Sequence, residues 1–251
     1  MGKADNSLQH IDIKAMRDGA QLSMEYKEYL VAHLTKHKIV QVLQGIRDLK
    51  VPGIDGHGAR FFKASWHTIK DDVIAPIMEF FDNERLYKAF SSTVVTLIPK
   101  NEEEKQVKDY RPIAGCTTFY KIISKIITAR LGKHIYDHIL LAYELIKGYY
   151  RKGGGLRFNI NGEYSEILQA KRGIRQGDPM SPLLFVIMME YLNKTMHKMQ
   201  RNYGFNHQCK CEKLFIINLT FADDVLMFSR GDQKLVELML EAFNKISIRR
   251  P

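Results

Sequence analysis

Two adjacent aspartates, Asp223 and Asp224, interrupt the apolar stretch LTFADDVLMF, which runs from Leu219 to Phe228. Alternating apolar residues on both sides predict a strand, a turn and a second strand, with the two carboxylates on the connecting tip. Mg²⁺ suits such oxygen ligands, because it usually takes one or two protein carboxylates and leaves other positions to water and substrate phosphates. The pair therefore indicates phosphate chemistry, and the alternative is an ordinary hairpin, since Asp is common in turns.

The composition is that of a globular protein suited to an acidic partner. The 251 residues are 45% hydrophobic, which is enough to build one large domain or two small ones. The formal net charge is +10 and the isoelectric point is about 9.4, so nucleic acid is a plausible partner. Three cysteines, Cys116, Cys209 and Cys211, make no disulfide framework and suit a reducing compartment.

Targeting and metal-binding segments are not evident. The spacing of His207, Cys209 and Cys211 matches no zinc pattern and lacks a fourth ligand, which favours a polar loop. The N-terminus lacks the apolar core of a signal peptide, and the longest apolar run, LLFVIMM, is too short to cross a bilayer. We expect a soluble intracellular protein, nuclear or cytoplasmic, with no membrane partner, and the oligomeric state stays open.

Helical and strand patterns are both present, which predicts an α+β fold. Apolar residues at helical spacing predict helices over 23–49, 61–81, 119–131, 181–199 and 235–246. β-branched alternation predicts a strand that ends at Pro99, and Asn161-Gly162 predicts a hairpin turn. The charged stretch 101–108 is expected to be a loop. In the helix over 119–131 we expect Lys121, Lys125 and Arg130 to lie away from the apolar face.

Three further segments could serve the aspartate pair. Lys100 follows the predicted strand, and Arg111 precedes a proline in extended chain, so both are fixed cations able to grip a triphosphate. In RGIRQGDPMSPLLF a glycine and a proline bracket Asp178 at the start of a buried helix, where backbone amides could meet a phosphate or a base. The structural alternatives are surface cations in the first two cases and an N-capped core helix in the third.

A series of motifs resembles the reverse transcriptase domain of LINE-type (non-LTR) retrotransposons, particularly plant ones. In chain order they are PGIDG, TLIPK, DYRPIA, YKIISKIITARL, NING, RGIRQGDPMSPLLFV and FADD, and the likeness runs from about Leu22 to Phe243. The resemblance implies a right-hand polymerase fold of fingers and palm. It divides the chain into an N-terminal tail over 1–22, a fingers-like region over 23–115 and a partial palm over 116–251.

The resemblance also implies roles for individual residues. Asp223 ligates the catalytic Mg²⁺, for which Mn²⁺ could substitute, and Asp224 supports the same site. The residues implied to bind nucleotide or template are Lys100, Arg111, Arg175, Gln176, Gly177, Asp178 and Phe221. Phe221 stands where many members of the family have Tyr, and plant members often carry Phe. The implied reaction is DNA synthesis from deoxynucleoside triphosphates on an RNA template with a DNA primer.

One element that the family supplies is not found in this sequence. Two-metal phosphoryl transfer requires carboxylates from two strands, and the family carries the second on an apolar strand before RQGDP. The carboxylates between residues 112 and 222 are Asp137, Glu144, Glu163, Glu166, Asp178, Glu190 and Glu212, and none lies in such a segment. The palm is therefore expected to be incomplete, through an internal deletion, and a second shortening is expected at ARLGKHIYDH.

The resemblance leaves enzymatic activity open. We expect no thumb after the match, no endonuclease domain before it, and no RNase H or zinc-knuckle segment. The alternative to a polymerase is a catalytically silent nucleic-acid-binding remnant of a retrotransposon, whose binding would weaken steeply with salt. A third possibility is a product that does not fold stably, for which a broad thermal melt would be evidence.

Overall fold

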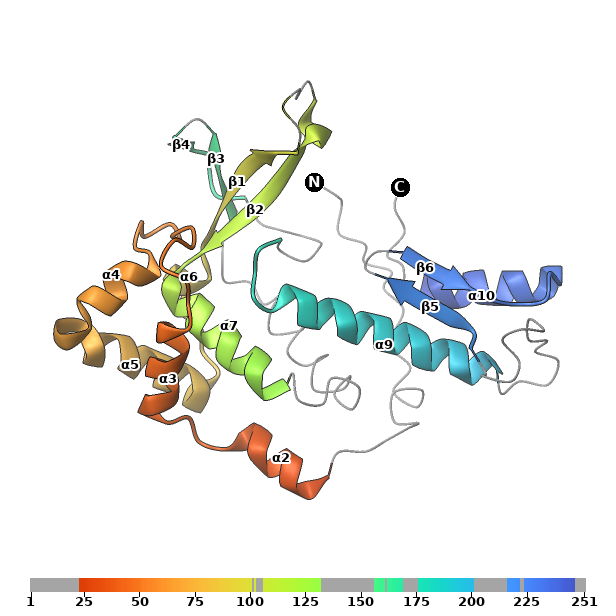
Figure 1. The fold of residues 1–251 in the computed structure, drawn as a ribbon, viewed down its shortest axis with the longest axis horizontal. Helices are drawn as coiled ribbons and strands as arrows, with labels where there is room; N and C mark the ends of the chain where they lie inside the picture. The colour runs from red at the N-terminus through yellow and green to blue at the C-terminus, as the bar shows by residue number, and fades with distance from the viewer. Residues whose placement is uncertain are drawn as a thin grey trace. The chain divides into compact units, whose positions relative to one another are not determined.

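A computed structural model of the chain describes residues 23–100, 102, 106–131, 156–160, 162–168, 176–200, 216–221 and 224–246 (Figure 1). These residues fall into two compact units. The first unit holds the described residues of 23–131 and 156–184, and the second holds those of 185–246. Helices and sheets are both present, as the α+β prediction requires.

The first unit is mainly helical. Its helices are α2 (Met24–Val31), α3 (Lys36–Gln44), α4 (Ala59–Ala64), α5 (Trp66–Asn83), α6 (Lys88–Ser91) and α7 (Thr118–Leu131). The side chain of Thr35 caps the start of α3 by accepting a hydrogen bond from the backbone N–H of Lys38 at 3.3 Å. The predicted helical stretch over 23–49 contains α2 and α3, while residues 32–35 and 45–49 are not helical. The stretch over 61–81 is interrupted at Ser65, whose φ of −91° and ψ of 7° separate α4 from α5.

The core of the first unit lies between these helices. Its fully buried side chains come from three of them: Ile39 and Leu43 of α3, Val73 and Ile77 of α5, and Ile122 and Ile126 of α7. In each of these helices the two residues are four positions apart, so they lie on one face of the helix. The packing therefore fixes α7 against α3 and α5, and the residues just before α7 are fixed with it.

A four-stranded sheet completes the first unit. Its strands are β1 (Thr93–Pro99), β2 (Tyr110–Cys116), β3 (Leu156–Ile160) and β4 (Glu163–Tyr164), in the order β2-β1-β3-β4. The β1–β2 and β3–β4 pairs are antiparallel, whereas β1 and β3 are parallel. The predicted strand and the predicted hairpin around Gly162 are confirmed. A short 3₁₀-helix, η1 (Val107–Asp109), lies where the sequence predicts a loop over 101–108.

A close backbone crossing joins the PGIDG segment to the end of β2. A Cβ atom added to Gly53 would lie 2.6 Å from the Cα and the backbone N of Thr117. The side chain of Lys121, one turn into α7, donates a hydrogen bond to the carbonyl of Val51. The glycine therefore permits a contact that no other residue could make without a backbone shift.

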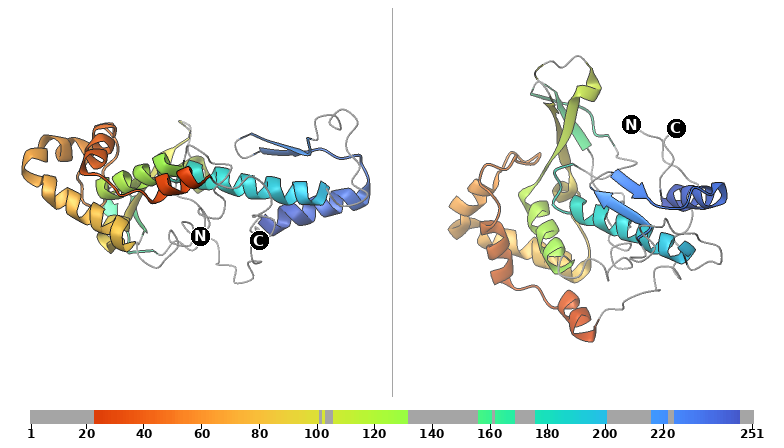
Figure 2. Two further views of the ribbon diagram at one scale, coloured as in Figure 1. Left: turned by 90° about the horizontal axis from the view of Figure 1, so that it is seen from below. Right: turned by 45° about the vertical axis from the view of Figure 1, so that its right-hand side comes forward.

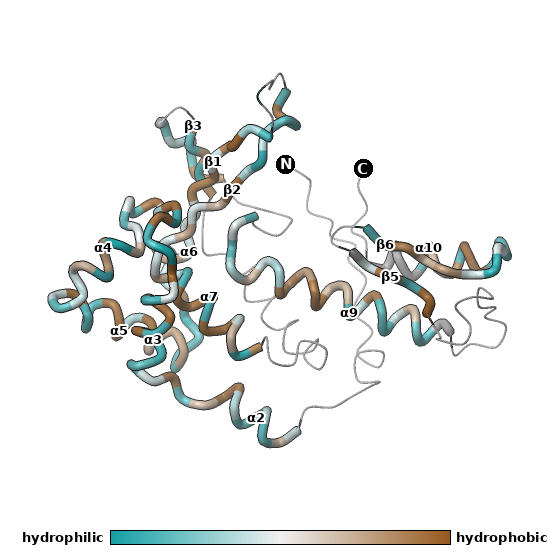
Figure 3. The backbone as a smooth tube through the Cα atoms, in the orientation of Figure 1, coloured by the Kyte–Doolittle hydropathy of each residue, from teal (hydrophilic) through white to brown (hydrophobic). Residues whose placement is uncertain are grey.

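The second unit consists of most of α9 (Ser181–Gln200), β5 (Asn218–Phe221), β6 (Asp224–Met227) and α10 (Gln233–Ile246). Figure 2 shows α9 beside both the β5–β6 hairpin and α10, and Figure 3 shows the hydrophobic middle of α9. The buried cluster among the described residues of this unit is formed by Leu192, Met196, Ile217 and Met239. The predicted helices over 181–199 and 235–246 and the predicted strand-turn-strand are confirmed.

Candidate functional site

The FADD segment closes a tight antiparallel hairpin. Phe221, the last residue of β5, pairs with Asp224, the first residue of β6. The side chains of Val225 and Met227 pack against the core of the second unit, which leaves Asp224 exposed at the start of the strand. Asp224 therefore belongs to the strand, not to the connecting tip as the sequence suggests. Asp223, and the side chain of Phe221, lie outside the described residues.

Two of the candidate cations lie on one hairpin of the first unit. Arg111 pairs with Ile98 across β1 and β2, and Lys100 follows two residues after Ile98. The backbone N–H of Lys100 donates to the carbonyl of Asp109 at 2.8 Å, and its Nζ donates to the carbonyl of Lys108 at 2.6 Å. Both candidate cations are exposed. The structure thus brings Lys100 and Arg111 together at the end of a sheet, with Lys100 held by the chain around it.

The RQGDP segment is attached to β2 through its backbone. The N–H of Ala114 donates to the carbonyl of Gln176 at 2.7 Å. Gly177 has a φ of +97°, and a Cβ atom there would lie 3.2 Å from the carbonyl oxygen of Ala114. A glycine is required for both reasons, because this φ is rare for other residues and the space is limited. Gln176 and Gly177 are exposed, and Arg175 lies outside the described residues.

Asp178 is buried, with 3% of its surface exposed. One carboxylate oxygen accepts a hydrogen bond from the hydroxyl of Tyr120 at 2.9 Å, and the other accepts from the backbone N–H of Met180 at 2.9 Å. Its backbone carbonyl also accepts from the N–H of Ser181, where α9 begins. These contacts match the structural alternative, an N-capped helix, and they join α7 to the start of α9. A nucleotide- or template-binding role for Asp178 stays a prediction.

The three cations of α7 differ from the sequence expectation. Lys121 was expected away from the apolar face, but it is buried, and burial lowers the pKa of its ammonium despite the neighbouring Cys116 and Asp55, which raise it. Arg130 lies 5.2 Å from the ring centroid of Phe81 and donates to the carbonyl of Ala32 at 2.7 Å. Lys121 and Arg130 therefore pack α7 against neighbouring segments, on the face that the sequence predicts to be polar.

Lys125 belongs to a group of basic residues that the sequence does not predict. Its Nζ donates to the carbonyl of Gly45 at 3.1 Å. The pKa of Lys125 is lowered by burial and then by the positive charges of Lys50 and Lys63. A basic cluster therefore surrounds the loop after α3. No local sequence pattern predicts this cluster, because its members come from the loop, α4 and α7.

The match to a known family covers the second half of the chain. Residues 137–248 match the family described as "Reverse transcriptase (RNA-dependent DNA polymerase)". Over these residues the chain is therefore similar to a reverse transcriptase domain. The matched residues include RQGDP and FADD, whereas Lys100 and Arg111 precede them. The expectation that the likeness begins near Leu22 is broader than this match.

Two curated relatives of the chain are proteins of transposable elements, which agrees with the match over 137–248. The chain is 29% identical over 154 residues to the "Transposon TX1 uncharacterized 149 kDa protein" of Xenopus laevis, an alignment that covers 55% of this chain and 12% of the relative. It is 29% identical over 166 residues to the "Retrovirus-related Pol polyprotein from type-2 retrotransposable element R2DM" of Drosophila melanogaster, covering 64% and 14%. The chain therefore spans about a seventh of these relatives or less.

Reverse transcriptase domains generally use divalent metal ions. An exposed carboxylate at the start of β6 has the oxygen donors that hard cations prefer, so Asp224 fits such an ion by its chemistry. Within the described ranges, no three His, Cys, Asp or Glu side chains gather to form a metal site. The candidate zinc segment around Cys209 lies outside those ranges. None of the described helices is long and apolar enough to cross a membrane.

Proposed function

We propose that this reverse transcriptase domain acts in DNA synthesis from deoxynucleoside triphosphates on an RNA template, extending a DNA primer. The family match over 137–248, which includes the FADD hairpin, carries this proposal. The similarity to proteins of transposable elements, one of them a retrovirus-related Pol polyprotein, and the net charge of +10 agree with an RNA template. The FADD motif with Phe221 favours a member of the plant LINE group, in a right-hand fold of fingers and palm.

In this proposal Asp223 and Asp224 hold the divalent ion, Mg²⁺ or Mn²⁺, which supplies stabilisation of charge on the transferred phosphoryl group. Lys100 and Arg111, which share the β1–β2 hairpin, bind the triphosphate through a point charge and a bidentate guanidinium. The segment from Arg175 to Asp178, with Phe221, positions template and nucleotide. The close attachment of Gln176 and Gly177 to β2 supports this role, because it fixes the segment beside the edge strand of the sheet.

A second candidate is nucleic-acid binding without polymerisation, and the placement of two of the described carboxylates favours it. Asp178 is occupied by Tyr120 and Met180, and Glu163 lies on β4, at the edge of the sheet. These residues therefore belong to a cap and to a hairpin. An internal deletion that removed the first catalytic strand would leave Asp223 and Asp224 without their usual carboxylate partner.

Primer extension on an RNA template distinguishes the two candidates. The full chain is assayed with Mg²⁺ or Mn²⁺ beside a double variant, Asp223→Ala with Asp224→Ala. A matched control is Asp71→Ala with Asp72→Ala, which removes another adjacent pair of aspartates, exposed on α5. RNA binding is measured for every protein by fluorescence anisotropy.

For a polymerase, we expect extension by the wild type and by the α5 control and none by the FADD double variant. RNA binding by the wild type without extension under either ion would overturn the polymerase and support the binding remnant. Absence of both from a chain with a cooperative melt would overturn both candidates, while a broad, non-cooperative melt would show that the product does not fold stably.

A further inference from the structure

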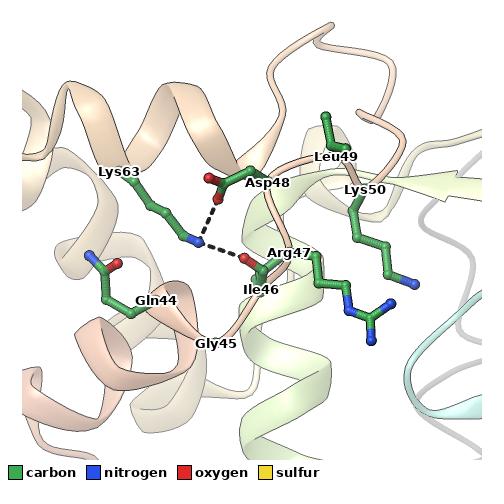
Figure 4. A pocket seen from close by; sticks show the side chains of 8 residues that line it. All are labelled: Gln44, Gly45, Ile46, Arg47, Asp48, Leu49, Lys50 and Lys63. Carbon is green, nitrogen blue, oxygen red and sulfur yellow. Dashed lines mark hydrogen bonds and ion pairs between the residues drawn. The ribbon is translucent and has the colours of Figure 1, made fainter.

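An open pocket of about 620 Å³ lies in the first unit, beside the loop that follows α3 (Figure 4). It is lined by Gln44, Gly45, Ile46, Arg47, Asp48, Leu49, Lys50 and Lys63. None of these residues belongs to the aspartate hairpin, to the β1–β2 cations or to RQGDP, and all precede the family match. The pocket is therefore a feature of the chain that the proposed polymerase site does not use.

The charges on the pocket wall are unbalanced. Lys63 is held by the carboxylate of Asp48 at 2.7 Å and by the carbonyl of Ile46 at 2.6 Å. Arg47 and Lys50 are exposed, and Figure 4 shows their side chains extending from the loop away from the Lys63–Asp48 pair. The lining therefore contains three cationic side chains and a single carboxylate.

A further positive charge reaches the pocket from α7. Lys125 donates to the carbonyl of Gly45, which belongs to the lining, at 3.1 Å. Lys50 and Lys63 are close enough to this ammonium to lower its pKa, in addition to the effect of burial. Like charges held together in this way repel one another, and a bound anion would relieve the repulsion.

We propose that this pocket binds a backbone phosphate of a single-stranded nucleic acid. Arg47 offers the planar fork that matches phosphate oxygens, and Lys50 adds a point charge beside it. A polymer is favoured over a small anion because the two cations are exposed on an open surface, and such cations gain affinity chiefly by releasing counterions from a densely charged chain. The proposal rests on the nucleic-acid partner of the proposed function but not on polymerisation.

Fluorescence anisotropy with a labelled single-stranded RNA tests the proposal, over a range of salt concentrations and with the full chain. The test variant is Arg47→Ala with Lys50→Ala, and the control is Lys27→Ala with Lys36→Ala, two exposed lysines of α2 and α3. We expect affinity at low salt to fall about tenfold in the test variant, and the salt slope to fall by about 0.7 for each phosphate that the variant no longer neutralises. The control is expected to change affinity by less than about twofold.

Two further variants separate charge from shape. Exchanging the cations, Arg47→Lys with Lys50→Arg, should retain most of the affinity, while Asp48→Asn should raise it because the one carboxylate of the lining becomes neutral. An equal loss of affinity in the test and control variants would show general basicity and overturn the proposal. A rise in affinity when Arg47 and Lys50 are removed would also overturn it.

Two competitors identify the ligand. DNA of the same sequence should compete about as well as RNA, since the phosphate is shared, whereas heparin at equal charge should compete less well. Heparin could instead compete as well as DNA, and its affinity could fall in the Arg47→Ala, Lys50→Ala variant by the same factor as the RNA affinity. The pocket would then be a site for polyanions in general, and the nucleic-acid assignment would be wrong. RNA binding is measured separately from primer extension. A failure of the chain or of the FADD double variant to extend a primer therefore leaves the result of the binding test unaffected.

Discussion

The two units of this chain differ in how firmly their candidate residues are supported. In the first unit, Lys100, Gln176 and Gly177 are attached to the sheet by backbone hydrogen bonds and close packing, and the core extends through α3, α5 and α7. In the second unit, the aspartate hairpin packs against a smaller buried cluster around Leu192 and Met196. Among the described residues, the candidate cations therefore lie on the scaffold with the larger buried core, and the aspartate hairpin lies on the one with the smaller core.

The largest expected effect on stability comes from creating a cavity of the same kind in each of the two cores. Leu43 and Leu192 are both fully buried, and replacing either by Ala should cost about 2–5 kcal/mol of unfolding free energy. Trp66 is the single tryptophan, and it packs against the core of the first unit. We expect Leu43→Ala to lower the midpoint of the Trp66 fluorescence transition in urea. We expect Leu192→Ala to lower the far-UV circular dichroism midpoint while the Trp66 midpoint stays in place.

The Trp66 signal decides whether the difference between the units is energetic. A drop of equal size in the Trp66 midpoint for Leu192→Ala would show that the two units unfold in one cooperative step. In that case the smaller core of the second unit would still be protected by the first. Coincident transitions in the wild type would predict this outcome before either variant is made.

A second test compares two glycines of the first unit. Gly53→Ala forces a Cβ to within 2.6 Å of the Thr117 backbone, so the crossing must open, at a cost of about 1–3 kcal/mol. Gly45→Ala meets only ordinary contacts, at 3.5 Å from the carbonyl of Val42, in a helical conformation with φ of −76°. Its effect should be within about 1 kcal/mol and stabilising in sign. The Trp66 midpoint measures both, and equal effects would contradict the close crossing.

The elements of the fold could be predicted because their signals are local. Helical spacing and β-branched alternation placed α7, α9 and β1 correctly, and Asn161-Gly162 gave the β3–β4 turn. The parallel pairing of β1 with β3 could not be predicted, since it depends on residues far apart in the sequence. The division into 23–115 and 116–251 stays a prediction, and the observed units divide the described residues differently.

The candidate site was predictable to the same extent and for the same reason. The strand-turn-strand around FADD follows from alternation, but the sequence places Asp224 on the connecting tip, whereas it is the exposed first residue of β6. The burial of Lys121 and the contact between Asp178 and Tyr120 depend on how α7 meets other segments, so the sequence could not separate a cap from a binding residue. Motif resemblance names the type of site, and packing determines which side chains remain available.

A third test asks how much Asp178 contributes as a cap. Asp178→Ala leaves the hydroxyl of Tyr120 and the N–H of Met180 without that partner, which should cost about 1–3 kcal/mol. Tyr120→Phe removes one of the two hydrogen bonds and should cost about 1 kcal/mol. Urea titration followed by Trp66 fluorescence orders the two variants. A larger loss of stability for Tyr120→Phe than for Asp178→Ala would contradict the capping role.

The smallest effect is expected on the exposed face of the β5–β6 hairpin. Leu219 and Leu226 pair across the strands with 53% and 61% of their surfaces exposed. Replacing either by Thr keeps a residue suited to strands, so the far-UV midpoint should move by no more than about 0.5 kcal/mol in free energy. A loss of about 2 kcal/mol or more, by the scale of core truncations, would mean that this face is covered in solution. The second unit would then be stabilised by a contact outside its own small core. The two units would then differ in whether they need a partner surface, and not only in the size of their buried cores.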